Sequence, residues 1–196
     1  GDGVSLINTV NSITSIDLDL MAPTPTVDGK GSHGGYCGPA VKPMALHMCA
    51  EIARNAGTAG LPMSAIGGIS NWRDAAEFIA LGAGTTQVCT AVMHYGFKIV
   101  EDMIDGLSDW MDQKGYAKIS DFQGMAVPNI TDWQNLNMNY EIVAEIEQTK
   151  CVKCGLCHIV CEDTSHQAIS AEKIKGERRY EVIDKECVGC NLCMHV

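Results

Sequence analysis

The sequence predicts an α/β domain followed by a small, cysteine-rich α+β domain. Across residues 4–115, short apolar runs of strand length alternate three times with longer segments whose apolar residues recur every three or four positions. Seven of the ten cysteines then fall in two closely spaced runs within the last quarter of the chain. Composition is that of a globular protein, since 46% of the 196 residues are hydrophobic and 19% are charged.

The first apolar run, residues 4–7, is typical of a buried parallel strand. The polar residues Asn8, Thr9, Asn11 and Ser12 follow it, and an α/β fold places its site at the C-terminal ends of such strands. The alternative is that they only begin a loop. Residues 17–40 are rich in Pro, Gly, Thr and Ser, and we expect a long loop that is either functional or disordered.

Three helices and two further strands follow in alternation. The first helix is expected to begin near Pro43 and end near Gly57, with one apolar stripe that buries Met48 and Cys49 in the core. Residues 61–66 predict the second strand, and Ser70 or Asn71 caps the helix after it. Residues 86–90 predict the third strand. The stripe of the helix that follows, closed by Gly115, comprises Val100, Met103, Ile104, Leu107 and Met111. Connections this short imply parallel strands.

The two cysteine runs have the spacing of bacterial ferredoxins. Three thiolates reach one cubane cluster from a single loop when two residues separate them, and the fourth cysteine of a run ligates the other run's cluster. Applied here, this rule assigns one 4Fe-4S cluster to Cys187, Cys190, Cys193 and the crossing Cys161. The second cluster takes Cys151, Cys154 and Cys157. Its fourth ligand is expected just after Val196, so we expect the chain to be cut there.

Other uses of these cysteines fit less well. Zinc ribbons use two CxxC pairs rather than two triplets, and disulfide scaffolds belong to small secreted domains. Glu162 stands where proline usually follows the fourth cysteine, which weakens the turn but not the ligation.

A hairpin is expected over residues 172–184, with its turn near Gly176. His158, His166 and His195 are expected at the surface.

A phosphate site is predicted from the glycine pair Gly67-Gly68 and from the segment Thr85 to Thr90 around the next strand. Glycine lets backbone N–H groups approach a phosphate, and the following helix adds the positive end of its dipole. In a TIM barrel, such a site is made by the loops after strands seven and eight. The alternative is a glycine pair that serves only a tight turn.

These units are interpreted as the C-terminal portion of a (β/α)8 TIM barrel. Three units cannot close a barrel of about 250 residues, and the chain starts without Met in a strand already under way, so we expect a fragment at both ends. The predicted domains are barrel units over residues 1–118, a connector with a short helix over 119–145, and a ferredoxin domain over 146–196.

Charge and hydropathy limit the partners. A formal net charge of -10 argues against nucleic acid and anionic membrane surfaces, and no apolar run reaches the length of a membrane helix. Cysteines outside disulfides imply a reducing compartment. The expectation is a cytoplasmic protein.

Five segments together resemble the FMN-containing subunit of bacterial NAD-dependent dihydropyrimidine dehydrogenase, and the resemblance covers nearly the whole chain. The segments are Asn8-Thr9-Val10-Asn11-Ser12, Gly34-Gly35-Tyr36-Cys37-Gly38-Pro39-Ala40, Ile66-Gly67-Gly68-Ile69, Gln87-Val88-Cys89-Thr90-Ala91 and Cys161-Glu162-Asp163-Thr164-Ser165-His166-Gln167. Dihydroorotate dehydrogenases are related, because they share the FMN barrel, but they lack this ferredoxin module.

The resemblance implies reduction of the C5=C6 bond of uracil or thymine, with Asn8 and Thr9 as pyrimidine-binding residues. It implies FMN contacts at Gly38, Gly67, Gly68, Cys89 and Thr90. The family uses a cysteine acid and a flavin-contacting lysine that are expected before Gly1, so no catalytic residue is assigned in this chain. NADH is expected to bind a separate FAD-containing subunit, in a heterotetramer, and to deliver electrons to FMN through the clusters.

Two other functions remain open from the sequence. An electron-transfer module would hold clusters without flavin. A ferredoxin-fused dihydroorotate dehydrogenase would need a cation for the carboxylate of orotate, and no Lys or Arg lies near residues 8–12.

Overall fold

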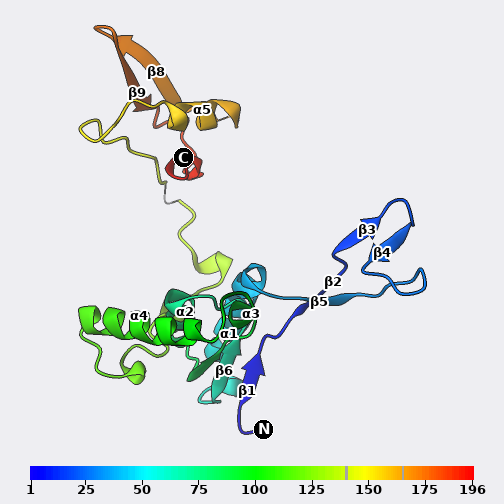
Figure 1. Cartoon of the computed structure of the whole chain (residues 1–196). Coiled ribbons are helices and arrows are strands. Elements are labelled where there is room, and N and C mark those ends of the chain that lie inside the picture. The colour runs from blue at the N-terminus through cyan, green and yellow to red at the C-terminus, as the bar shows by residue number, and fades with distance from the viewer. Residues whose placement is uncertain (140, 165) are drawn as a thin grey trace. The chain divides into compact units, whose positions relative to one another are not determined.

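The structure is a computed structural model that describes residues 1–139, 141–164 and 166–196. Its contacts divide the chain into two compact units, Gly1–Thr131 and Asp132–Val196 (Figure 1). The division falls inside the connector predicted over residues 119–145. Ser165, which belongs to one of the motifs quoted above, lies outside the described residues.

A three-stranded parallel sheet forms the centre of the first unit, as the alternation of strands and helices predicts. Its strands are β1 (Val4–Leu6), β6 (Met63–Ile66) and β7 (Thr85–Gln87), in the order β1-β6-β7. Leu6 lies opposite Ala65 in the register, and Ala65 lies opposite Thr86. The mixed α/β class with a parallel sheet is confirmed, whereas the barrel stays a prediction.

Four helices accompany the sheet: α1 (Lys42–Arg54), α2 (Trp72–Ala80), α3 (Thr90–Tyr95) and α4 (Lys98–Lys114). The capping prediction is confirmed, because the side chain of Asn71 accepts hydrogen bonds at the start of α2. The single helix expected after β7 is two helices, because the chain turns at Gly96, where φ is 81°. The core takes residues from the sheet and from all four helices, and its largest members are Met63, Ile69, Phe78, Leu81 and Met103.

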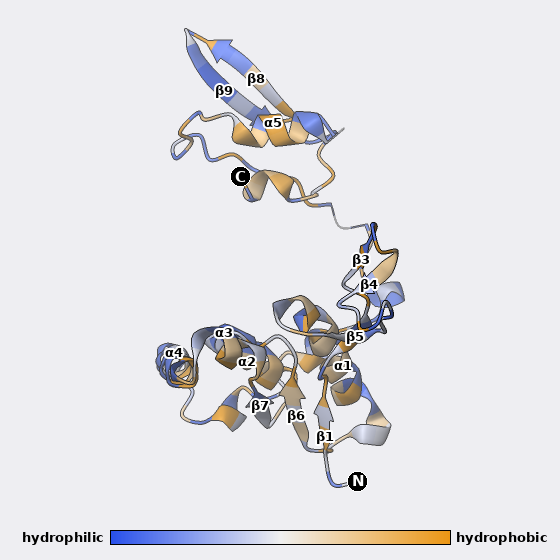
Figure 2. Ribbon diagram, turned by 45° about the vertical axis from the view of Figure 1, so that its right-hand side comes forward, coloured by the Kyte–Doolittle hydropathy of each residue, from blue (hydrophilic) through white to orange (hydrophobic). Residues whose placement is uncertain are grey.

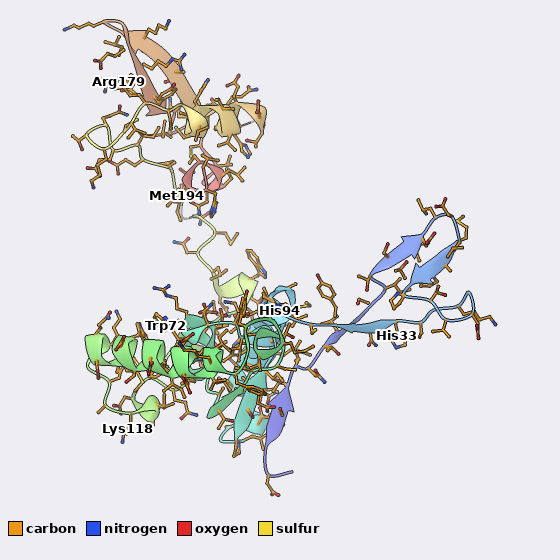
Figure 3. The ribbon with its side chains drawn as sticks, viewed as in Figure 1. His33, Trp72, His94, Lys118, Arg179 and Met194 are labelled. Carbon is orange, nitrogen blue, oxygen red and sulfur yellow. The ribbon has the colours of Figure 1, made fainter. Side chains whose placement is uncertain are left out.

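Two of the predicted apolar stripes are wrong in part. Cys49 is fully buried, but Met48 is 48% exposed, because it lies on a flank of α1 that the core does not reach. On α4, Met103 is buried, while Val100 and Ile104 are exposed, at 39% and 62%. Helix α4 packs on α2, which carries Trp72 (labelled in Figure 3). The ring centroids of Trp72 and Trp110 lie 6.1 Å apart in this contact.

Residues 10–36 form an excursion from the sheet rather than the loop predicted over residues 17–40. Two antiparallel ladders of three residues each build it: β2 (Val10–Ser12) pairs with β5 (Gly34–Tyr36), and β3 (Ser15–Asp17) pairs with β4 (Ala22–Thr24) (Figure 1). Strands this short, rich in Gly and Pro, carry no periodic pattern by which a sequence can predict them.

The second unit consists of α5 (Leu156–Asp163) and a hairpin of β8 (Ile169–Ile174) and β9 (Glu177–Val182). The predicted turn is confirmed, because Lys175 and Gly176 both have positive φ, as a type I′ hairpin requires. Figure 2 shows a hydrophilic hairpin beside the more hydrophobic α5. Of the three histidines expected at the surface, His195 is exposed, whereas His158 and His166 are half-buried. The Nδ1 atom of His158 lies 2.6 Å from the carbonyl oxygen of Ile169.

Short 3-10 turns complete the description. The expected connector helix is replaced by three of them, η3 (Ile119–Asp121), η4 (Val127–Asn129) and η5 (Trp133–Asn135). The others are η1 (Pro39–Val41), η2 (Ala56–Thr58) and η6 (Leu192–Met194). Within the described ranges, no helix has both the length and the apolar character needed to cross a membrane.

Candidate functional site

The residues predicted to contact FMN and pyrimidine lie together at one edge of the sheet. Because β1, β6 and β7 are parallel, the segments that follow them meet at the same edge. A cleft of about 110 Å³ lies there. It is lined by all seven residues that the sequence singles out, Asn8, Thr9, Gly38, Gly67, Gly68, Cys89 and Thr90.

Six further residues of the cleft were missed by the sequence analysis as site residues: Cys37, Ile66, Ile69, Ser70, Gln87 and Met93. Ile66 and Gln87 are the last residues of β6 and β7. The position at a strand's C-terminal end was therefore the signal that could have found them.

The glycines of the cleft bring two backbone segments into contact. Gly68 has φ +75°, and a Cβ placed there would lie 2.7 Å from the carbonyl oxygen of Gly38 and 3.0 Å from the backbone nitrogen of Lys42. At Gly67, where φ is +131°, a Cβ would lie 2.8 Å from that of Ala45. Any other residue is excluded on both counts, sterically and by its backbone conformation. The result is a cradle without side chains, which fits a phosphate.

The helix after this glycine pair does not offer its N-terminus freely. Asn71 Oδ1 accepts hydrogen bonds from the backbone N–H groups of Arg73 and Asp74, and Asp74 Oδ2 accepts them from Ser70 and Asn71. This reciprocal arrangement is a capping box. An anion in the cleft would therefore meet the backbone of the glycine pair and of Cys89 and Thr90, because the N–H groups of Ser70 and Asn71 before α2, and of Arg73 and Asp74 in its first turn, are already bonded.

A partly buried ion pair lies directly behind the glycine pair. The Nζ atom of Lys42 lies 2.6 Å from Asp74 Oδ1 and 2.9 Å from Glu77 Oε2. The hydrogen bond to Asp74 raises the pKa of Lys42, against the opposing effect of burial. Among the residues that the structure describes, Asp74 is the buried polar or charged residue, with 6% of its surface exposed.

A polar network crosses the three strands below the cleft. Gln87 Nε2 donates to the hydroxyl oxygens of Ser5 and Ser64, 2.8 Å from each, and Thr85 Oγ1 donates to Ser64 over 2.8 Å. Gln87 also lines the cleft, so the network fixes one of its walls.

Five of the seven cysteines of the two runs belong to a small core in the second unit, and the other two, Cys154 and Cys190, are exposed. Cys161, on α5, is buried with Ala168, Ile169 and Tyr180, and Cys151, Cys157, Cys187 and Cys193 pack around them. Burial raises the pKa of Cys157, and the charges of Cys151, Cys154 and Cys193 raise it further. Burial likewise raises the pKa of Cys193, with further increases from Cys190, Cys187 and Cys161.

The donor chemistry of these residues fits iron-sulfur clusters. Two of the thiols already accept backbone hydrogen bonds, Cys161 from Ala168 N at 3.3 Å and Cys187 from Ala144 N at 3.4 Å, and such bonds tune cluster potentials. Among the described residues, no three His, Cys, Asp or Glu side chains converge as ligands of one metal ion. A cubane cluster does not need such convergence, because each thiolate binds a different iron.

Comparison with known proteins defines the class. Residues 1–111 match the family described as dihydroorotate dehydrogenase, and residues 144–196 match a 4Fe-4S dicluster domain. The chain belongs to the dihydroorotate dehydrogenase family, and a 4Fe-4S ferredoxin-type domain follows the residues that match this family.

Particular relatives narrow the comparison. The sequence is 45% identical over 168 residues to the NAD-dependent dihydropyrimidine dehydrogenase subunit PreA of Escherichia coli (strain K12), an alignment that covers 86% of this chain and 41% of the relative. It is 36% identical over 158 residues to the chloroplastic dihydropyrimidine dehydrogenase (NADP(+)) of Arabidopsis thaliana, covering 79% of this chain and 37% of the relative.

A third relative belongs to the other branch of the family. The catalytic subunit of dihydroorotate dehydrogenase B (NAD(+)) from Pyrococcus horikoshii is 39% identical over 126 residues, which is 64% of this chain and 39% of the relative. The chain thus spans about two fifths of the length of these relatives. The resemblance inferred from the motifs is confirmed.

Proposed function

We propose that this chain is part of an oxidoreductase that reduces uracil or thymine to the 5,6-dihydropyrimidine. The observation that carries the proposal is that Asn8 and Thr9 line the same cleft as the cradle of Gly67 and Gly68, which has no side chains. The names of the relatives from E. coli and A. thaliana, both dihydropyrimidine dehydrogenases, support the substrate class.

The proposed architecture is the C-terminal part of an FMN-binding TIM barrel over residues 1–118, a connector over 119–145 and a ferredoxin domain over 146–196. Three parallel strands that end at a common cleft support this assignment, because barrel enzymes place their sites at that face.

Each group of residues has a distinct role in this proposal. Gly38, Gly67, Gly68, Cys89 and Thr90 hold the FMN phosphate, mostly through backbone N–H groups. Asn8 offers an amide donor and acceptor to the amide edge of the pyrimidine ring, and Thr9 adds a hydroxyl. FMN, when bound, supplies hydride chemistry on one side and accepts single electrons on the other.

The cysteines connect this site to its source of electrons. Cys151, Cys154 and Cys157 hold one 4Fe-4S cluster, and Cys161, Cys187, Cys190 and Cys193 hold the other. The word "subunit" in the name of the E. coli relative supports a partner, for which we propose an FAD- and NADH-binding subunit in a cytoplasmic heterotetramer.

A dihydroorotate dehydrogenase activity is the second candidate, and the match of residues 1–111 and the P. horikoshii relative favour it. Orotate carries a carboxylate that requires a cation in its site. The described residues that line the cleft include no Lys or Arg. This observation favours uracil or thymine over orotate.

The test is an anaerobic cofactor analysis of the natural polypeptide that contains these residues. FMN together with about eight irons, enough for two cubane clusters, is the expected result, and reduction of uracil or thymine with the partner subunit is then assayed against orotate. Clusters without flavin would instead define an electron-transfer module, and turnover of orotate alone would establish the second candidate.

A further inference from the structure

We propose that Lys42 and Asp74 are positioning residues that hold the phosphate loop, residues 67–70, in the conformation that binds the phosphate of FMN. The inference rests on the proposed function. It assigns no contact with the phosphate to either side chain; the two residues act by holding the backbone of the loop and by balancing each other's charge behind it.

Asp74 holds the end of the phosphate loop from beneath. Its Oδ2 atom accepts hydrogen bonds from the backbone N–H of Ser70 at 2.8 Å, from that of Asn71 at 3.2 Å, and from the Asn71 side chain at 3.0 Å. Because the carboxylate is only 6% exposed, water cannot readily replace these bonds. The loop therefore leaves Gly68 toward α2 along a fixed path.

Lys42 holds the beginning of the same loop. A Cβ on Gly68 would lie 2.9 Å from Lys42 Cβ and 3.0 Å from its backbone nitrogen, so the two backbones are in direct contact. The Lys42 ammonium then reaches past the loop to Asp74 Oδ1, 2.6 Å away. One residue of α1 thus packs against Gly68 and binds the carboxylate that anchors Ser70.

Charge gives the pair a second effect on the same site. An unpaired carboxylate behind the loop would repel a phosphate dianion, and the interaction is strong where water is excluded. The Lys42 ammonium compensates that charge. Glu77 binds the same ammonium at 2.9 Å, but it is half exposed and makes no hydrogen bond to the loop, which makes it a matched control.

The experiment compares the dissociation constants of FMN and riboflavin, measured by quenching of flavin fluorescence, for the natural polypeptide and its Asp74→Asn, Lys42→Met and Glu77→Gln variants. Riboflavin lacks the phosphate and therefore reports on the rest of the site. We expect the first two variants to bind FMN about 10- to 100-fold more weakly, the loss that is typical when a residue that orients a metal ligand is replaced, and to bind riboflavin as before. Glu77→Gln should change neither constant.

Further measurements separate positioning from general stability. Melting temperature by circular dichroism and cluster absorbance are recorded for every variant. Should Asp74→Asn fail to fold, Lys42→Met still tests the proposal, because it removes the bond to Asp74 Oδ1 but keeps the bonds of Ser70 and Asn71 to Asp74 Oδ2. Lys42→Arg should restore part of the FMN affinity that Lys42→Met loses.

Equal losses of FMN and riboflavin affinity, or no loss of either, would overturn the proposal. If the unaltered protein binds neither flavin, the proposed function itself fails; if it prefers FMN and the variants keep that preference, only the inference on Lys42 and Asp74 fails.

Discussion

The Lys42 Nζ and Asp74 Oδ1 atoms, 2.6 Å apart, join α1 to α2 across the loop that follows β6. The two residues are 32 positions apart in the sequence. Their pairing connects the stability of the first unit to the geometry of the candidate flavin cleft, because the same carboxylate also bonds the N–H of Ser70.

The ion pair predicts a loss of stability in alkali. The hydrogen bond to Asp74 raises the pKa of Lys42 above its ordinary value of 10.5, so its contribution is complete below that value and disappears as pH rises through the higher folded pKa. In urea titrations from pH 7 upward, the free energy of unfolding should fall beyond pH 10.5 more steeply for the unaltered protein than for Lys42→Met. At pH 7 the variant should be less stable by about 1 to 3 kcal/mol. Parallel pH profiles would contradict the pairing.

Gly68→Ala should abolish retention of FMN while the cluster absorbance stays intact. The added Cβ would lie 2.7 Å from the Gly38 carbonyl oxygen, on a backbone with φ +75°, so the cradle must open. Gly84→Ala is the matched control, because its Cβ would meet nothing closer than 3.6 Å. Flavin content after gel filtration is the measurement. Full flavin in Gly68→Ala would remove the phosphate assignment.

Gly106→Ala should destabilise the first unit even though alanine favours helices by about 1 kcal/mol. A Cβ at Gly106 would lie 2.8 Å from Cγ of Trp72, in the contact between α2 and α4 (Figure 3). Overpacking of this kind costs about 1 to 3 kcal/mol, which exceeds the gain. The exposed neighbour Ser108→Ala gains helix propensity without the clash, so its melting temperature should hold or rise. A stabilised Gly106→Ala variant would show that α4 does not pack this closely.

Serine substitutions test how the cysteines divide between two clusters. Cys154→Ser and Cys190→Ser should each lower the iron content from about eight to about four per chain, and their electron paramagnetic resonance spectra should lose different signals. Cys161→Ser should remove the same signal as Cys190→Ser. Cys49→Ala, in the other unit, should keep all the iron. A Cys161→Ser spectrum that matches Cys154→Ser would reverse the assignment.

Thiol reactivity should distinguish the cysteines of the first unit. Burial raises the pKa of Cys49 to about 11, so the thiol should resist iodoacetamide at pH 8 in the folded protein, because the thiolate is the nucleophile. Cys89 is exposed and lines the cleft, and FMN should protect it. Mass spectrometry of peptides alkylated with and without FMN measures both effects. Labelling of Cys89 that FMN leaves unchanged would place the flavin elsewhere.

Features that depend on local spacing could be predicted from the sequence. The two cysteine runs, the three parallel strands, the Asn71 cap and the turn at Gly176 each follow from residues within a few positions of one another. The glycine pair and the segment after the third strand predicted the phosphate side of the cleft, and the resemblance to a known family added Asn8, Thr9 and Gly38. The structure brings these residues to one edge of the sheet, together with six residues that the sequence analysis missed.

Only the tertiary structure decided the features that depend on which surfaces meet. The apolar side chains of Met48 and Ile104 are exposed because nothing in the first unit covers them, and periodicity alone does not say which flank of a stripe is covered. The excursion over residues 10–36 pairs strands too short for a periodic signal. The contact of Lys42 with both Gly68 and Asp74 arises because parallel packing brings the ends of β1 and β6 and the starts of α1 and α2 to the same place, a coincidence in space that no local pattern encodes.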